Sequence, residues 1–137
     1  MGLEFSGFDP ALALDAILTC DEREIVTRTR QGLPPYLALE AMAQTCGMHL
    51  RQRYDFLVHA YLVSMAELRY PPELGKEALT IRAALTAETT AATSYAVRID
   101  DGPAFRMLMG RHTISGTPDN LFRGRFERLC TTPSFIA

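Results

Sequence analysis

The chain has 137 residues, of which 47% are hydrophobic and 22% charged, and its net charge is −2. This composition predicts one globular domain around a single core, and it excludes a disordered or membrane-spanning chain. The small net charge gives no electrostatic reason to expect a nucleic acid or a membrane as partner. Three distant cysteines, Cys20, Cys46 and Cys130, have no Cys-x-x-Cys spacing and no companion histidines. They favour a reducing cytoplasm over a disulfide framework, and we expect no metal and no cofactor.

The first third of the chain predicts one strand and one uncertain segment. After an irregular start to about Asp9, the apolar residues 11–18 fit either a helical turn or an edge segment. Residues 20–23 (Cys-Asp-Glu-Arg) are typical of a turn. Residues 24–29 alternate charged and β-branched side chains, which predicts a first strand.

Residues 33–44 (Leu-Pro-Pro-Tyr-Leu-Ala-Leu-Glu-Ala-Met-Ala-Gln) begin a strongly apolar helix that extends to about Arg53. The prolines pre-set φ for a first helical turn, and strong helix formers follow. Helical spacing places one set of residues on a single stripe, namely Leu37, Glu40, Ala41, Gln44 and Met48. Since the other faces are apolar too, we expect a curled sheet to bury this helix.

Four further strands are predicted after the helix, over residues 56–70, 78–87, 89–100 and 103–114. Pro71 and Pro72 end the first of these strands, and Asp100-Asp101-Gly102 is a hairpin signal between the last two. Residues 116–137 predict a less regular tail, with a short helix near residues 121–129 as an option. The whole chain, 1–137, thus predicts a single α+β domain in which an antiparallel meander wraps around one long central helix. An open sheet edge in such a domain favours a homodimer or higher oligomer.

Glu40 is the one acid in the apolar part of this helix, and it has two interpretations. It either caps backbone groups or pairs with a neighbouring base, or it is a general acid/base with a pKa raised by burial. Gln44, one turn further along, either holds this acid or a substrate oxygen, or is an ordinary interior glutamine.

The element order and residues 33–44 together resemble the hotdog fold. The helix resembles the central-helix motif of the 3-hydroxyacyl-(acyl carrier protein) dehydratases, approximately M-P-G-x-L-x-x-E/D-A-M-x-Q. Matches fall at Pro34, Leu37, Glu40, Ala41, Met42 and Gln44. The strand over 64–70, with the turn from Pro71 to Gly75, is similar to the strand and the proline-glycine turn that come after that helix in the family. The Leu-Pro-Pro-Tyr variant is closer to the dehydratase-like proteins of aryl-polyene gene clusters.

The resemblance implies an acyl-thioester site in a tunnel at a dimer interface, with no cofactor. Glu40 takes the place of the catalytic acid and Gln44 that of the motif's glutamine. Pro35, Tyr36 and Leu37, at the helix N-terminus where the family binds the thioester carbonyl, are then substrate-binding positions. The implied partner is an acyl thioester on acyl carrier protein or coenzyme A, in fatty-acid or aryl-polyene type synthesis.

Two positions depart from the family pattern. The family's catalytic histidine lies fourteen positions before the acid, where this chain has Val26. In some relatives a histidine instead precedes an N-terminal segment similar to residues 9–15, and Gly7 falls near that place. Pro35 replaces the motif's glycine, whose amide helps to bind the carbonyl oxygen, and proline has no N–H to donate. The amide of Tyr36 substitutes only if the substrate shifts.

Three histidines remain as partners for the acid: His49, His59 and His112. Each fits a surface or strand-end role better, and His59 is the best substitute because its strand should run beside the helix. Cys46 fits a small buried hydrophobe better than a nucleophile. Five arginines of the C-terminal third either meet an acidic carrier protein or form a solvated face; they are Arg106, Arg111, Arg123, Arg125 and Arg128.

Three functions follow from these residues. The first is a 3-hydroxyacyl-thioester dehydratase or hydratase with Glu40 as acid/base. The second is an acyl thioesterase, in which a lone helix carboxylate activates water and no histidine is needed. The third is a non-catalytic subunit that binds an acyl carrier or completes the site of an active relative. The motif favours the first.

Overall fold

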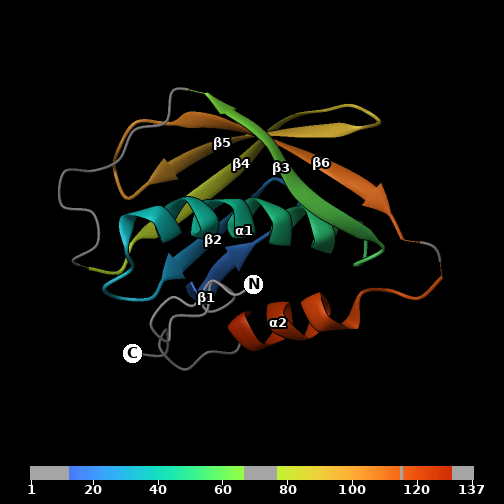
Figure 1. Cartoon of the computed structure of the whole chain (residues 1–137), viewed down its shortest axis with the longest axis horizontal. Coiled ribbons are helices and arrows are strands. Elements are labelled where there is room, and N and C mark those ends of the chain that lie inside the picture. The colour runs from blue at the N-terminus through green and yellow to red at the C-terminus, as the bar shows by residue number, and fades with distance from the viewer. Residues whose placement is uncertain (1–12, 67–76, 115, 131–137) are drawn as a thin grey trace.

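The computed structural model describes residues 13–66, 77–114 and 116–130. These form a six-stranded antiparallel sheet and two helices (Figure 1). The elements in chain order are β1 (Leu14–Cys20), β2 (Glu24–Thr29), α1 (Pro35–Arg53), β3 (Val58–Ala66), β4 (Thr80–Glu88), β5 (Ala92–Ile99), β6 (Phe105–Thr113) and α2 (Asn120–Cys130). In the sheet the strands lie in the order β1-β2-β4-β5-β6-β3.

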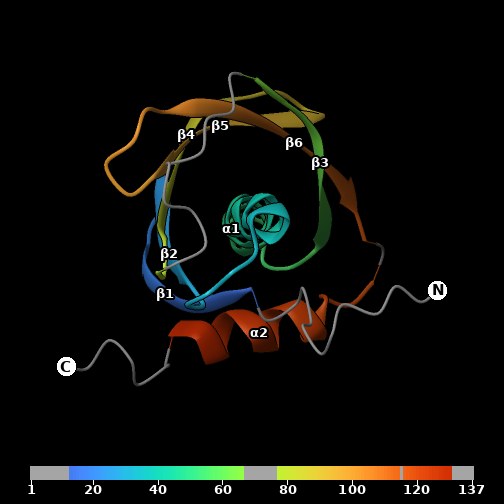
Figure 2. The ribbon, with the colours of Figure 1, turned by 60° about the vertical axis from the view of Figure 1, so that its left-hand side comes forward.

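The sheet curls around α1, as Figure 2 shows in a view close to the helix axis. Alternation along the strands turns apolar residues inward, so that Tyr95, Val97 and Ile99 of β5 are all buried. On α1, Ala38, Ala41 and other small or apolar residues are buried against them. The curled sheet predicted from the apolar helix is therefore observed. One side of α1, between β3 and α2, is not covered by the sheet (Figure 2).

The predicted turns are in place at both ends of the sheet. Asp21 forms a side-chain turn between β1 and β2, because its Oδ1 accepts from the backbone N–H groups of Arg23 (2.8 Å) and Glu24 (2.9 Å). Residues 11–18 fitted either a helical turn or an edge segment, and from Leu14 onward they belong to the edge strand β1. At the other hairpin, Gly102 donates its N–H to Ile99 (2.9 Å), as Asp100-Asp101-Gly102 predicts.

The order of the strands differs from a simple meander. β1 lies beside β2, and β4, β5 and β6 follow one another, whereas β3 pairs with β6 at the far edge. The connection from β2 runs through α1 on the concave side, which carries the chain across the sheet before β3 begins (Figure 1). Sequence neighbours usually pair, and here the intervening helix separates β2 from β3. As a result β1 and β3 are the two edges.

The strand after α1 begins later than predicted. Asp55 and Phe56 both have positive φ (55° and 61°), and Phe56 donates its N–H to Arg51 (2.7 Å). These two residues close the helix and reverse the chain, so Phe56 belongs to a helix-ending turn rather than to a strand. The predicted strand end at Pro71 and the turn to Gly75 lie outside the described residues.

The tail contains α2, which replaces the less regular segment predicted there and agrees with the optional helix. Asp119 caps it by accepting the N–H of Phe122 at 3.2 Å. Leu129 is buried, and α2 lies against β1 and beside α1 (Figures 1 and 2). Among the described helices, none combines the length and apolarity that a membrane span requires.

Candidate functional site

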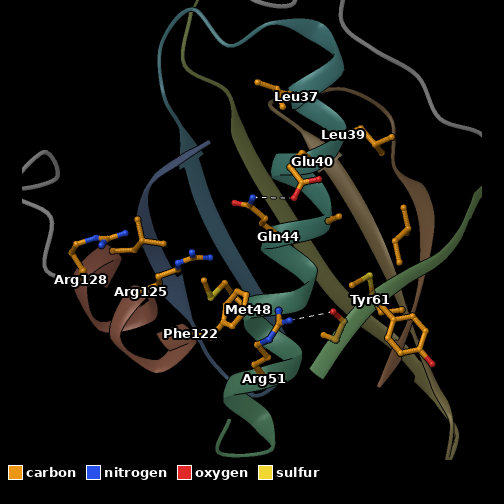
Figure 3. Close-up of a pocket in the computed structure, with 15 residues that line it drawn as sticks. Leu37, Leu39, Glu40, Gln44, Met48, Arg51, Tyr61, Phe122, Arg125 and Arg128 are labelled. Atoms are coloured by element: carbon orange, nitrogen blue, oxygen red, sulfur yellow. Dashed lines mark hydrogen bonds between the residues drawn. The ribbon is translucent and has the colours of Figure 1, made fainter. Parts of the chain in front are cut away.

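A cavity of about 600 Å³ opens along the side of α1 that the sheet leaves uncovered (Figure 3). Its walls are the stripe of α1 that faces away from the sheet, the middle of β3, and the side of α2 that faces α1. The lining residues from α1 are Leu37, Leu39, Glu40, Ala43, Gln44, Met48 and Arg51; β3 and β6 add Ala60, Tyr61, Leu62 and Met109, and α2 adds Phe122, Arg125, Arg128 and Leu129. The lining is mainly apolar, with one carboxylate and three guanidinium groups. Such a groove suits an extended, partly apolar ligand.

Glu40 and Gln44 both line this cavity and contact each other. The Gln44 side chain donates from Nε2 to Oε2 of Glu40 at 3.1 Å (Figure 3). The stripe predicted from helical spacing therefore exists, and the amide orients the acid toward the groove. Glu40 is exposed in the single chain, which differs from the burial expected of it, because the sheet does not cover this side of α1.

The three predicted substrate-binding positions at the start of the helix form its first turn. Pro35 is the first helical residue, and α1 has no side-chain cap. Leu37 is buried and lines the cavity, and it donates its N–H to Pro34 at 2.9 Å. Since Pro35 has no N–H, the first backbone donor that α1 offers is that of Tyr36.

His59 does not join this set. It lies near the start of β3 opposite His112 of β6, its side chain is 56% exposed, and it is absent from the cavity lining. Its Nδ1 is 3.9 Å from Oδ2 of Asp119, at the start of α2. Residues 59 and 40 are separated because β3 starts at the C-terminal end of α1, whereas Glu40 lies near the N-terminal end.

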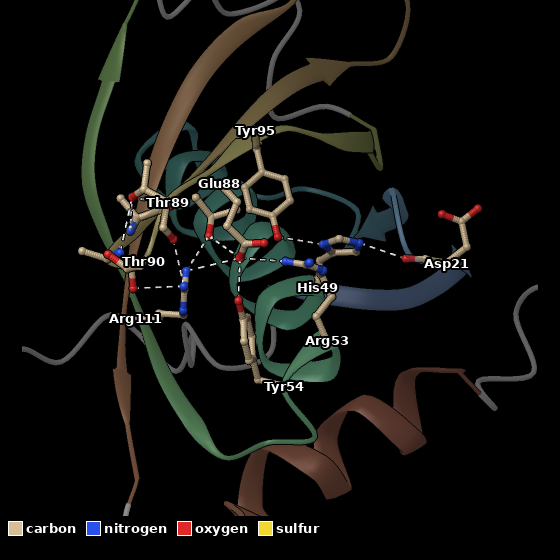
Figure 4. A network of polar contacts seen from close by, with 12 residues as sticks. Asp21, His49, Arg53, Tyr54, Glu88, Thr89, Thr90, Tyr95 and Arg111 are labelled. Carbon is tan, nitrogen blue, oxygen red and sulfur yellow. Dashed lines mark hydrogen bonds and ion pairs between the residues drawn. The ribbon is translucent and has the colours of Figure 1, made fainter.

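His49 is a core residue, contrary to the surface role expected of it. It is fully buried and bridges two elements, because Tyr95 donates its hydroxyl to Nδ1 (2.7 Å) and Nε2 donates to the carbonyl of Asp21 (2.9 Å; Figure 4). Burial lowers the pKa of His49. It points away from the cavity and is unsuited to work with Glu40. Cys46 is buried, as expected, and burial raises its pKa.

The five C-terminal arginines do not form one face. Arg111 belongs to a cluster around Glu88, whose Oε2 accepts from Arg53 (2.9 Å), Tyr54 (2.7 Å) and Arg111 (3.2 Å; Figure 4). Arg53 above all holds the pKa of Glu88 at about 2. Arg123 donates to the backbone of Asp55. Only Arg125 and Arg128 line the cavity.

Sequence reasoning missed Arg51 and Phe122 as cavity residues. Arg51 lies in the last turn of α1, on the same helical stripe as Glu40, and this spacing was the available signal. Phe122 comes from the tail, so only the packing of α2 beside α1 brings it here. Among the described residues no cluster of ligand side chains has the makeup of a metal site.

No protein-family model and no curated protein matches the chain. Solved structures do. One is YhdA of Lactococcus lactis, named as a thioesterase (12% identity, 74% of this chain and 94% of that one, TM-score 0.58). Another is the dehydratase heterocomplex ApeI:P of Xenorhabdus doucetiae (15% identity, 86% of this chain and 90% of that one, TM-score 0.59). A third is the PaaI protein of the phenylacetic acid degradation operon of E. coli (17% identity, 78% of this chain and 83% of that one, TM-score 0.56).

At these identities the likeness concerns the fold. The neighbours are hotdog proteins, and they share the curled antiparallel sheet around a helix that the chain forms. The chain has the hotdog fold.

Proposed function

We propose that this protein acts on acyl thioesters as a dehydratase or hydratase of the 3-hydroxyacyl type, with Glu40 as its acid/base. The observation that carries the proposal is the Glu40–Gln44 pair, which opens into an apolar groove of about 600 Å³. The resemblance of residues 33–44 to the dehydratase helix motif supports this chemistry over others. It also supports acyl carrier protein as the carrier, in fatty-acid or aryl-polyene type synthesis.

Glu40 moves one proton in this reaction. Its carboxylate takes the proton from C2 of the 3-hydroxyacyl group, the C2–C3 double bond forms, and the C3–O bond breaks. The same carboxyl group then gives its proton to the departing hydroxyl, which leaves as water. Gln44 holds the carboxylate in position through its 3.1 Å hydrogen bond. The amide of Tyr36 is the backbone donor available for the thioester oxygen.

A thioesterase is the second candidate, and one observation favours it. Among the described residues that line the cavity, none is a histidine. Glu40 therefore has no imidazole beside it to serve as a second acid/base. A lone carboxylate can activate water for attack on the thioester carbonyl, and the thiol then leaves. YhdA, which is named as a thioesterase, has the same fold.

Hydration of a short enoyl thioester, measured by loss of its conjugated absorbance, tests the proposal. Glu40→Gln keeps the size of the side chain and removes its acid/base, so we expect it to lower the rate by about 10²-fold or more. Glu22→Gln is the matched control, because Glu22 is exposed in the β1–β2 turn and outside the cavity lining. Its rate should equal that of the wild type.

Thiol release, read in the same cuvette, separates the two candidates. Release without hydration, lost in Glu40→Gln, overturns the dehydratase and supports the thioesterase. Neither signal from folded wild-type protein on either carrier overturns both. The chain would then be a binding subunit or one half of a split site, and a heterocomplex such as ApeI:P is known within this fold.

A further inference from the structure

Arg51 is a buried cation at the end of the cavity opposite Glu40. It is only 9% exposed, and Nη2 donates to the carbonyl of Ala60 at 3.2 Å. Its guanidinium carbon lies 3.8 Å from the ring centroid of Phe122 (Figure 3). Its Nε has no hydrogen-bond partner within the described parts of the chain. The ion pairs between described residues do not include it either.

Burying the charge of Arg51 is energetically unfavourable for the protein when no anion is bound. Burial without a bonded counter-charge disfavours a cation, and burial indeed lowers the pKa of Arg51, with Asp119 acting in the opposite sense. Arginine nevertheless stays protonated. A buried guanidinium that faces a cavity is therefore suited to an anion that enters from solvent.

A second guanidinium strengthens the positive charge at this end. Arg125 of α2 also lines the cavity, and its guanidinium carbon lies 4.9 Å from the centroid of the same Phe122 ring. Arg51 and Arg125 thus share one aromatic platform from two different helices. α2 is fixed beside α1 by the Phe56–Phe126 contact and by the bond from Arg123 to Asp55.

We propose that Arg51 and Arg125 bind an oxyanion of the thioester substrate while its reacting end lies at Glu40. The thioester class rests on the proposed function; the anion itself follows from the arginines. The eleven residues from Glu40 to Arg51 rise about 16 Å along the helix. An extended phosphopantetheine arm has about as many bonds between sulfur and phosphorus as five extended residues, roughly 16–18 Å.

Two oxyanions have the required chemistry and reach. One is the phosphate of the phosphopantetheine arm, and the other is a carboxylate at the far end of the acyl chain. Two pairs of probes distinguish them. One is phosphopantetheine against pantetheine. The other is the tetradecanedioyl amide of aminopantetheine, whose chain spans about 15 Å, against the tetradecanoyl amide. Within each pair only the charge at one end changes, and no turnover occurs.

Binding of these probes, measured by calorimetry, tests the proposal. We expect wild-type protein to bind one anionic probe at least about tenfold more tightly than its neutral counterpart. Arg51→Gln and Arg125→Gln should remove most of this preference. Arg106→Gln is the matched control, because Arg106 is exposed on β6, outside the cavity lining, and this variant should keep the preference.

The pair that shows the preference identifies the source of the anion. Equal binding within both pairs overturns the proposal, as does a preference that Arg51→Gln and Arg125→Gln both retain. If Arg51→Gln does not fold, the binding preference of Arg125→Gln tests the proposal instead. Added salt must also weaken the preference of the wild-type protein for the anionic probe. Because no catalysis is needed, a failure of enoyl hydration overturns the proposed function and leaves this result standing.

Discussion

His49 is held in one protonation state by its two hydrogen bonds. The Asp21 carbonyl only accepts, so Nε2 carries the proton and Nδ1 accepts from Tyr95. Protonation of Nδ1 would reverse this bond, so that Nδ1 donates to the Tyr95 hydroxyl and the hydroxyl proton loses its acceptor. The lowered pKa of His49 agrees with this, since burial penalises the charged ring.

The stability of the protein should therefore fall as the pH drops below about 6.5. A histidine whose pKa is lower in the folded state than in the unfolded state contributes fully above the unfolded value and loses that contribution as the pH falls toward the folded one. We expect urea unfolding of the wild type to show this loss as the pH falls below about 6.5, the ordinary pKa of histidine. His49→Gln should flatten the dependence, whereas His112→Gln, at an exposed strand end, should retain it. Equal slopes in wild type and His49→Gln would contradict the assignment.

At the scale of elements, Glu88 joins three of them. It ends β4, and it accepts from Arg53 and Tyr54 at the C-terminus of α1 and from Arg111 of β6. Arg111 also donates from Nη2 to the carbonyls of Thr89 (2.9 Å) and Thr90 (3.0 Å) in the β4–β5 turn. The cluster fixes the end of the helix against the hairpin.

Glu88→Gln should destabilise the protein by about 1 kcal/mol, a value kept small because the cluster lies near solvent. Since the folded pKa is about 2 and the ordinary value 4.5, the stabilisation is complete above about pH 4.5 and is lost as the pH falls toward 2. The difference in unfolding free energy between wild type and Glu88→Gln should therefore shrink over that range. Glu22→Gln should show no such difference at neutral pH. A constant difference down to pH 2 would exclude the ionised cluster.

The sequence predicted the individual strands and helices better than it predicted which strands lie side by side in the sheet. The period of residues 78–87 and 89–100 identifies β4 and β5, and the apolar helix requires an enclosing sheet. The far-edge position of β3 depends on how α1 crosses the sheet, which no local pattern encodes. The same holds for the site: the α1 spacing predicts that Glu40 and Gln44 share a face, whereas Phe122 and Arg125 reach the cavity only through tertiary packing of α2.

At the scale of the molecule, β3 is an open edge beside the cavity. Tyr61 and Val63 on this strand are 51% and 52% exposed, and Ala60 and Leu62 line the cavity. An exposed strand with apolar side chains is suited to pair with another strand. Pairing of β3 with β3 of a second copy would form a two-fold interface next to Glu40 and would close the groove from that side.

We therefore predict a dimer with twice the 15.2 kDa mass of the chain, measured by light scattering after gel filtration. Val63→Lys should give monomers, because a two-fold axis near β3 brings the two lysines together and charged side chains oppose edge pairing. Leu121→Lys is the control: Leu121 is 63% exposed on α2, and this variant should stay dimeric. If the groove needs the second copy, Val63→Lys should also lose thioester activity while remaining folded. A monomeric wild type, or a dimeric Val63→Lys, would place the interface elsewhere or remove it.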